Sequence, residues 1–131
     1  MKEKVPATVA IVDEHLLTRK TLSCRLASLG FDTVMEAENV KEFIDQMTAL
    51  RAPDICLVDI KMPVTGWLEM AIRMKRHWPG IKILFFSMPV SDAYISQLME
   101  IGVDGFVSKK STFKELHNAL LKTVKKSRQL Q

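Results

Sequence analysis

The chain has 131 residues, of which 47% are hydrophobic and 26% charged, a balance that fits one globular domain and excludes a fibrous or disordered protein. It has neither a secretory signal nor an apolar run near the roughly 18 residues of a membrane span, so we expect a cytoplasmic protein without membrane contact. The net charge of +4 is uneven, because residues 109–131 hold seven basic residues and one acidic residue, which leaves −2 for the rest.

Two strands, each followed by a helix, are predicted in the first part of the chain. Residues 8–12 (TVAIV) form a strand, and residues 14–29 follow as a helix with leucines on one face and Gly30 as its stop. Residues 32–36 form a weaker strand. Asn39, with Glu42 three residues later, has the position of an N-cap for the second helix, which we expect to end at Pro53.

Three further strand and helix pairs are predicted in the rest of the chain. Residues 54–58 form a strand that runs directly into Asp59, and apolar residues from Trp67 to Trp78 mark a helix. A nearly all-apolar strand covers residues 81–86, a short helix covers 91–101, and a short strand covers 105–107. Thr112 and Glu115 form a capping box for the last helix.

Five strands that alternate with five helices predict a doubly wound α/β fold, in which helices cover both faces of a parallel sheet. In such sheets, ligands bind at the carboxyl ends of the strands. Polar residues stand at these ends on four of the five strands, namely Asp13, Glu14, Asp59, Ser87, Ser108 and Lys109.

These strand-end residues have the chemistry that phosphoryl transfer needs. Three carboxylates at one sheet edge repel one another unless a cation intervenes, and their hard oxygen atoms suit Mg²⁺. Lys109 adds a positive charge for an anion, and Ser87 adds a hydroxyl donor. Singly, each has a plainer interpretation: Asp13 and Glu14 can cap a helix, and Asp59 can form a turn.

Four segments resemble the receiver domain of two-component response regulators: VDEH (12–15), DIKMP (59–63), FFS (85–87) and GVDGFVSK (102–109). They look most like the NarL/FixJ group, in which the receiver usually precedes a LuxR-type helix-turn-helix. The resemblance implies a flavodoxin-like (βα)₅ fold with strand order 2-1-3-4-5. We expect the receiver to span residues 1–125, with residues 126–131 as a tail or the start of a linker to an effector domain.

The resemblance also implies a role for each strand-end residue. Asp59 would accept a phosphoryl group from a sensor histidine kinase or a phosphotransfer protein. Asp13, Glu14 and Asp59, with the carbonyl of Lys61, would hold Mg²⁺. Lys109 would bind the phosphoryl group.

Two further residues fall at the family's switch positions, the Ser87 hydroxyl and the Phe106 ring. The resemblance therefore implies a signalling phosphoacceptor, rather than an enzyme with an external substrate, whose output is the control of transcription. A second copy of this chain, in a homodimer, is a further expected partner. DNA would be contacted only through an effector domain.

Several positions depart from the family pattern. Trp67 stands where receivers usually have glycine, Glu14 is longer than the common aspartate, Lys110 replaces a frequent proline, and Met88 replaces a small residue. These departures keep open a degenerate receiver that signals without phosphate. A haloacid-dehalogenase-like phosphatase is a further alternative, although the chain lacks that family's Asp-x-Asp pair.

The basic tail and the two cysteines have plainer interpretations. The tail raises the alternative of nucleic-acid binding, but we favour a solvated helix face, because lysine is common there. Cys24 and Cys56 have neither metal-ligand spacing nor a disulfide framework, and both are predicted to be buried thiols.

Overall fold

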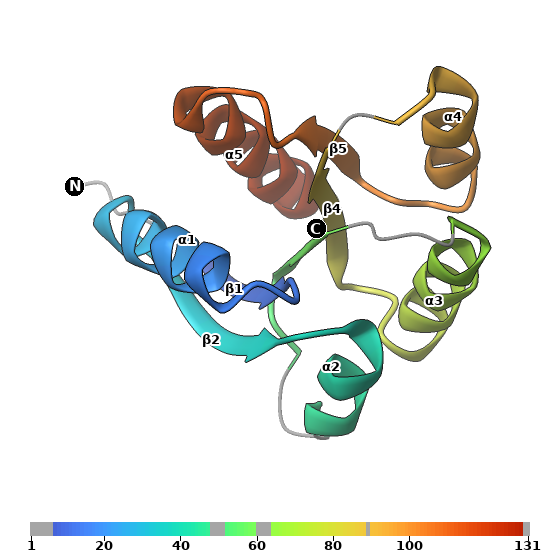
Figure 1. Ribbon diagram of the computed structural model, residues 1–131, viewed down its shortest axis with the longest axis horizontal. Coiled ribbons are helices and arrows are strands. Elements are labelled where there is room, and N and C mark those ends of the chain that lie inside the picture. Colours follow the sequence, from blue (N-terminus) through green and yellow to red (C-terminus); the bar gives the residue numbers. More distant parts are fainter. Residues whose placement is uncertain (1–6, 48–51, 60–63, 89, 130–131) are drawn as a thin grey trace.

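The computed structural model describes residues 7–47, 52–59, 64–88 and 90–129, and within these ranges five strands alternate with five helices (Figure 1). The strands are β1 (Ala7–Val12), β2 (Phe31–Ala37), β3 (Ile55–Val58), β4 (Lys82–Ser87) and β5 (Gly105–Ser108). The helices are α1 (Leu16–Ser28), α2 (Val40–Gln46), α3 (Val64–His77), α4 (Asp92–Glu100) and α5 (Phe113–Gln129).

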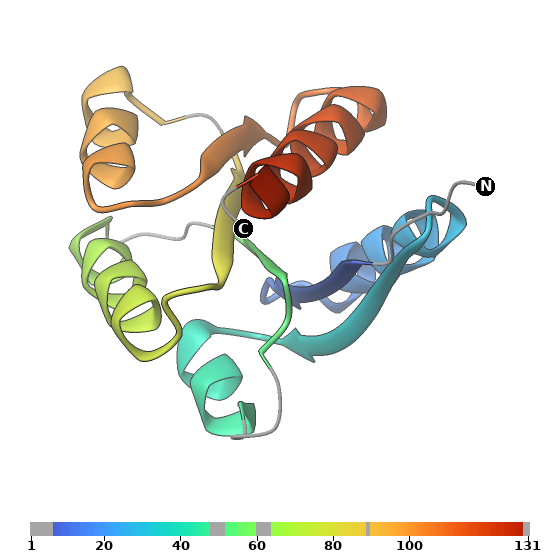
Figure 2. The same ribbon diagram turned by 180° about the vertical axis from the view of Figure 1, so that it is seen from behind.

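All neighbouring strands are parallel, in the order β2-β1-β3-β4-β5. Helices α1 and α5 cover one face of the sheet, and α2, α3 and α4 cover the other (Figures 1 and 2). The doubly wound, flavodoxin-like fold predicted from the sequence is therefore confirmed. Within the described ranges, no helix combines the length and apolar character that a membrane crossing needs.

The pleat of each strand divides the apolar side chains between two cores. Along β3, Ile55 and Leu57 belong to the core under α1 and α5, whereas Cys56 and Val58 belong to the core under α2, α3 and α4. These four side chains are almost fully buried, which stabilises the fold by about 1.5–3 kcal/mol for each large aliphatic residue. The strand that ends at Asp59 is therefore held firmly from both faces.

Two helix boundaries differ from the sequence-based prediction. Helix α2 ends at Gln46, and Met47 after it is extended, well before Pro53. A helix usually ends at or before the residue that precedes a proline, so Pro53 sets only the latest possible end of this helix. Helix α3 begins at Val64, before Trp67, because the apolar spacing predicts only the part of a helix that faces the core.

The prediction that both cysteines are buried is wrong for one of them. Cys56 is buried, but Cys24 is exposed on α1. Cys24 is two residues from both Leu22 and Leu26, so it points away from the face that these leucines bury.

Both predicted helix starts are capped by side-chain hydrogen bonds. The Asn39 Oδ1 atom accepts the Glu42 N–H at 2.7 Å, and Thr112 Oγ1 accepts the Glu115 N–H at 3.1 Å. The Glu115 Oε1 atom in turn accepts the Thr112 N–H at 2.9 Å, which completes a capping box. Helix α5 continues to Gln129, and the domain boundary after residue 125 stays a prediction.

Candidate functional site

The ends of β1 and β3 place two carboxylates side by side. Val12 pairs with Val58 in the sheet, and the next residues, Asp13 and Asp59, extend the ladder, since the Asp59 N–H donates to the Val12 carbonyl at 2.9 Å. The Asp13 N–H donates to the Ala37 carbonyl of β2, also at 2.9 Å. Both residues are buried, with exposed fractions of 3% and 8%, so their charges need compensation from the protein or from a ligand.

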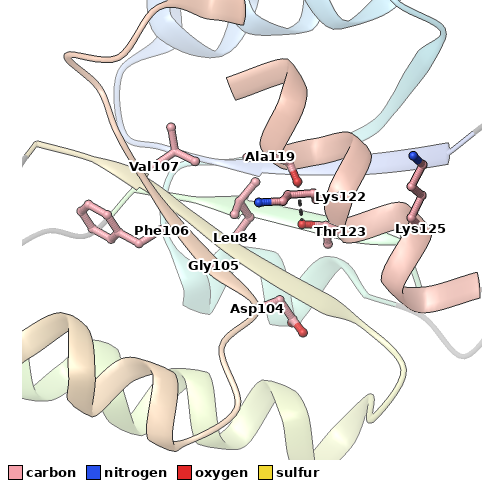
Figure 3. A pocket seen from close by; sticks show the side chains of 9 residues that line it. All are labelled: Leu84, Asp104, Gly105, Phe106, Val107, Ala119, Lys122, Thr123 and Lys125. Atoms are coloured by element: carbon pink, nitrogen blue, oxygen red, sulfur yellow. Dashed lines mark hydrogen bonds between the residues drawn. The ribbon is translucent and has the colours of Figure 1, made fainter. Parts of the chain in front are cut away.

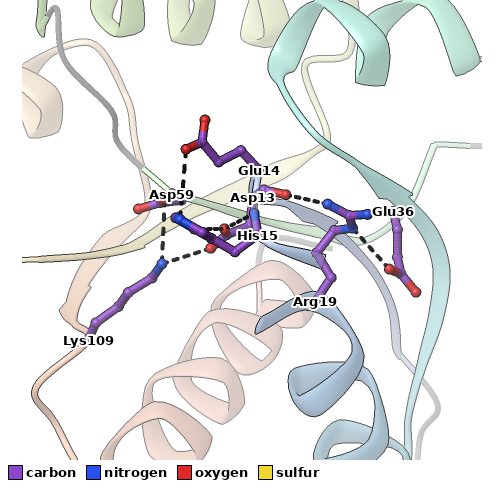
Figure 4. A network of polar contacts seen from close by, with 7 residues as sticks. All are labelled: Asp13, Glu14, His15, Arg19, Glu36, Asp59 and Lys109. Carbon is purple, nitrogen blue, oxygen red and sulfur yellow. Dashed lines mark hydrogen bonds and ion pairs between the residues drawn. The ribbon is translucent and has the colours of Figure 1, made fainter. Parts of the chain in front are cut away.

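Lys109 supplies part of that compensation (Figure 4). It follows β5, where its N–H donates to the Ser87 carbonyl at 2.7 Å. Its Nζ atom lies 2.7 Å from Asp13 Oδ2 and 3.4 Å from Asp59 Oδ2. One ammonium group therefore bridges the carboxylates that follow two different strands.

Asp13 remains ionised at neutral pH. Burial raises the pKa of its carboxyl group, but hydrogen bonds from Lys109 and from the His15 backbone and ring, together with the charge of Lys109, outweigh it. The net result is a pKa below the ordinary value of 3.8.

The residues just after Asp13 complete the cluster. The His15 ring lies between two carboxylates, with Nδ1 at 3.1 Å from Asp13 Oδ1 and Nε2 at 3.8 Å from Glu14 Oε2 (Figure 4). Three possible metal-ligand atoms lie within 4.8 Å of one another, one each from Asp13, His15 and Asp59. Sequence reasoning gave His15 no role, although its place directly after two acidic residues was a signal.

The charge and donor atoms of this cluster fit a divalent cation. The carboxylates of Asp13, Glu14 and Asp59 with the single ammonium of Lys109 leave a net charge of −2. Carboxylate oxygen atoms are the usual protein ligands of Mg²⁺. Lys61, whose carbonyl was predicted to be a further ligand, lies outside the described residues.

Arg19 holds the backbone of this cluster in place, which sequence reasoning did not predict. Its guanidinium donates to the Asp13 carbonyl at 2.7 Å and to Glu36 Oε1 at 3.1 Å (Figure 4). Lys20 Nζ donates to the other oxygen of Glu36 at 3.0 Å. The side chain therefore ties the end of β1 to the end of β2.

Comparison with protein families matches residues 9–121 of this chain to a family described as the response regulator receiver domain. This chain belongs to that family. Receiver domains bind Mg²⁺ at an acidic pocket, and this structure brings Asp13 and Asp59 together in an acidic group.

Among relatives of this receiver, the response regulator GacA of Pseudomonas syringae pv. syringae is 31% identical over 113 residues, 86% of this chain and 52% of that protein. The response regulator protein VraR of Staphylococcus saprophyticus is 27% identical over 120 residues, 91% of this chain and 57% of that protein. The chain thus spans about half the length of these curated relatives.

Solved structures agree with this receiver fold. A LuxR-family two-component response regulator from Aurantimonas sp. SI85-9A1 has a TM-score of 0.77 and 28% identity, and the match covers 88% of this chain and 83% of that one. The isolated receiver domain of RcsB from Salmonella enterica serovar Typhimurium has a TM-score of 0.78 at 23% identity, covering 89% and 87%. The latter likeness shows the fold alone.

The two predicted switch residues of the receiver lie on its neighbouring strands β4 and β5. Ser87 ends β4 and is buried, and its hydroxyl donates to the Met88 carbonyl at 3.0 Å. Phe106 pairs with Phe85 across the strands and packs, half-buried, against the core under α4. Met88 is exposed. The side chain of Trp67 lies outside the described part of the chain.

Two hollows lie beside α5 in the receiver. One, of about 530 Å³, lies between β5 and α5, and its lining includes Asp104, Lys122 and Lys125 (Figure 3). The other, of about 420 Å³, lies between α1 and the start of α5, and Lys109 lines it. This second hollow shares Lys109 with the acidic cluster.

Proposed function

We propose that this receiver domain accepts a phosphoryl group on the Asp59 carboxylate, with Mg²⁺ bound, from a sensor histidine kinase or a phosphotransfer protein. The observation that carries the proposal is the buried Asp59 carboxylate, which lies beside Asp13 and 3.4 Å from Lys109 Nζ. The phosphorylated receiver then controls an output, which we propose to be transcription, because the solved neighbours include RcsB bound to a promoter. DNA is contacted through an effector domain.

Each residue has a distinct task in this reaction. An oxygen atom of Asp59 attacks the phosphorus atom of the donor phosphohistidine, and the bond from phosphorus to the donor's ring nitrogen breaks as the acyl phosphate forms. Lys109 stabilises the phosphoryl oxygen atoms by charge. Asp13, Glu14 and Asp59, with the carbonyl of Lys61, hold Mg²⁺, which supplies further positive charge there when bound.

The conformational response involves the two switch residues. The Ser87 hydroxyl, which now donates to the Met88 carbonyl, turns to donate to an oxygen atom of the phosphoryl group. Phe106, which is only half-buried, moves into the space that this turn vacates. The β4–α4 and β5 region then changes between two packed arrangements.

We propose that the phosphodonor protein docks at the hollow between α1 and the start of α5. Leu16 and Leu17 on α1 are large, apolar and exposed, and Leu17 lines the hollow with Phe113 and Lys109. A partner bound there reaches the cluster directly. A second copy of this chain, which would form the expected homodimer, is the alternative occupant.

Intact-mass spectrometry tests the phosphoacceptor. With Mg²⁺ and a small phosphodonor such as acetyl phosphate, the wild-type chain should gain the mass of one phosphoryl group, and Asp59→Asn should gain none. Asp54→Asn is a matched control, because Asp54 precedes the same strand at its opposite end. Equal labelling of Asp59→Asn and wild type would refute the assignment.

The alternative functions have less support. The family match and the assembled cluster of Asp13, Asp59 and Lys109 favour a phosphorylated receiver over a degenerate one. Nothing in the comparisons favours a haloacid-dehalogenase-like phosphatase.

A further inference from the structure

Asp104 extends the pairing of β4 and β5 at the end of the sheet opposite to the acidic cluster (Figure 3). Residues 105–108 of β5 pair with residues 84–87 of β4. One step before the first pair, the Asp104 N–H donates to the Ile83 carbonyl at 2.9 Å, and the Ile83 N–H donates to Asp104 Oδ2 at 2.8 Å. Asp104 thus engages both backbone groups of Ile83, one through its main chain and one through its side chain.

Lys75, in the last turn of α3, holds the Asp104 carboxylate in place. Its Nζ atom donates to Asp104 Oδ2 at 2.9 Å and to the Ile81 carbonyl, also at 2.9 Å. Lys82 Nζ lies 3.9 Å from the other carboxylate oxygen. The Asp104 side chain is only 10% exposed, so these ammonium groups compensate a charge that water reaches poorly.

The short strand β5 depends on the hydrogen bonds at its two ends. It has four residues, and as the last strand of the sheet it pairs with β4 alone. Gly105 at its start adds no side chain, which weakens a strand. Beyond its other end, the Lys109 N–H donates to the Ser87 carbonyl at 2.7 Å. The strand is therefore anchored to β4 by Asp104 at one end and by the Lys109 backbone at the other.

The two anchors contact parts of β4 that behave differently in the proposed function. Ser87 is the residue whose hydroxyl turns toward the phosphoryl group, so the anchor beside it lies in the region that rearranges. Ile83 is fully buried and lies near the start of β4, outside that region. Asp104 therefore keeps β5 aligned with β4 while the carboxyl ends of these strands change.

We infer that Asp104 is a positioning residue, whose hydrogen bonds with Ile83 hold β5 along β4 so that Lys109 reaches the phosphoryl group on Asp59. The inference rests on the proposed function, in which Lys109 stabilises the phosphoryl oxygen atoms. Asp104 itself touches none of the reacting atoms. It acts through the strand that Lys109 follows, and a misplacement of about 1 Å in a reacting site can cost roughly a hundredfold in rate.

The rate at which acetyl phosphate labels the whole chain in the presence of Mg²⁺, followed by intact-mass spectrometry, tests the inference. Asp104→Ala removes the acceptor of the Ile83 N–H, and its labelling should be at least about tenfold slower than that of wild type, within the range that misplacement causes. Lys75→Met is the matched control, because it removes the same ion pair but leaves the hydrogen bonds between Asp104 and Ile83. Lys75→Met should therefore keep the wild-type rate.

Two further measurements separate positioning from a general loss of stability. By calorimetry, Asp104→Ala should bind Mg²⁺ no more weakly than wild type, because Asp13 and Asp59 follow β1 and β3 and do not depend on β5. By nuclear magnetic resonance, the backbone amide signal of Lys109 should shift in Asp104→Ala and stay unchanged in Lys75→Met. Partial unfolding would instead weaken Mg²⁺ binding together with the labelling rate.

Wild-type labelling of Asp104→Ala, or equal slowing of Lys75→Met, would overturn the inference and leave phosphorylation of Asp59 standing. If Asp104→Ala does not fold, Asp104→Asn decides, because it keeps an oxygen acceptor for the Ile83 N–H and should be labelled at the wild-type rate; slow labelling of this variant overturns the inference. If wild type gains no phosphoryl group, the proposed function fails. The Lys109 amide signal then still tests the placement, and an unchanged signal in Asp104→Ala refutes it.

Discussion

Replacing Arg19 by methionine tests how the end of β1 is held. The substitution keeps an unbranched apolar stem but removes the guanidinium group, which donates hydrogen bonds to the Asp13 carbonyl and to Glu36. The Arg19 side chain is 11% exposed, so water cannot easily replace these hydrogen bonds. The Asp13 carbonyl and the Glu36 carboxylate therefore lose a buried donor.

The expected loss of stability follows from these contacts. Removing one partner of a fully buried ion pair costs about 3–5 kcal/mol, and a hydrogen bond to a charged group contributes about 1.5–3 kcal/mol. Glu36 is 22% exposed and keeps Lys20 at 3.0 Å, which moderates the penalty. We expect Arg19→Met to lower the free energy of unfolding by about 2–3 kcal/mol.

Urea denaturation followed by circular dichroism measures this loss, and calorimetry with Mg²⁺ measures the effect on the site. The Mg²⁺ affinity should also fall, because Asp13 is less firmly positioned. Lys20→Met is the matched control: Lys20 contacts the same Glu36, but its side chain is 62% exposed, so the loss should be no more than about 1 kcal/mol. If Arg19→Met unfolds like the Lys20→Met control, Arg19 does not hold the end of β1.

Three further predictions concern other parts of the chain. The pKa of Asp13 is lower in the folded chain than its ordinary value of 3.8, so the ionised carboxylate stabilises the fold fully above pH 3.8 and this stabilisation is lost as the pH falls through the folded-state pKa. The difference in unfolding free energy between wild type and Asp13→Asn should therefore shrink below pH 3.8. Iodoacetamide should modify exposed Cys24 in the native chain, and Cys56, whose pKa is raised by burial, only after unfolding; mass spectrometry of peptides distinguishes them. Gly105→Ala places a Cβ atom 2.7 Å from Leu84 Cδ1, and thermal denaturation should show a loss of about 1–3 kcal/mol that Leu84→Val partly restores.

The sequence contained enough information to predict the sheet and part of the site. Alternating strand and helix patterns imply parallel strands, and parallel strands end at one edge of the sheet. Asp13, Asp59 and Lys109 each follow a strand, so their proximity did not depend on details of side-chain packing. The structure brings these three together through Lys109 Nζ.

The contacts of Arg19 and His15 could not be predicted in this way. Arg19 meets Glu36 because the fold places the start of α1 beside the end of β2, so that residues 17 positions apart in the sequence come into contact. That placement depends on how the helix packs on the twisted sheet, and no local spacing specifies it. His15 turns toward Asp13 because of a single rotamer choice, which the order of residues leaves open.

The two distances from Lys109 give a physical reason for linking cation binding to phosphorylation. The Nζ atom is closer to Asp13 than to Asp59, 2.7 Å against 3.4 Å, so the two carboxylates share one ammonium group unequally. In the proposed function, Asp13 would hold a divalent cation and would no longer need the lysine for charge compensation. Lys109 would then be available to contact the phosphoryl oxygen atoms on Asp59, so that binding of the cation would favour phosphorylation through Lys109 as well as by charge.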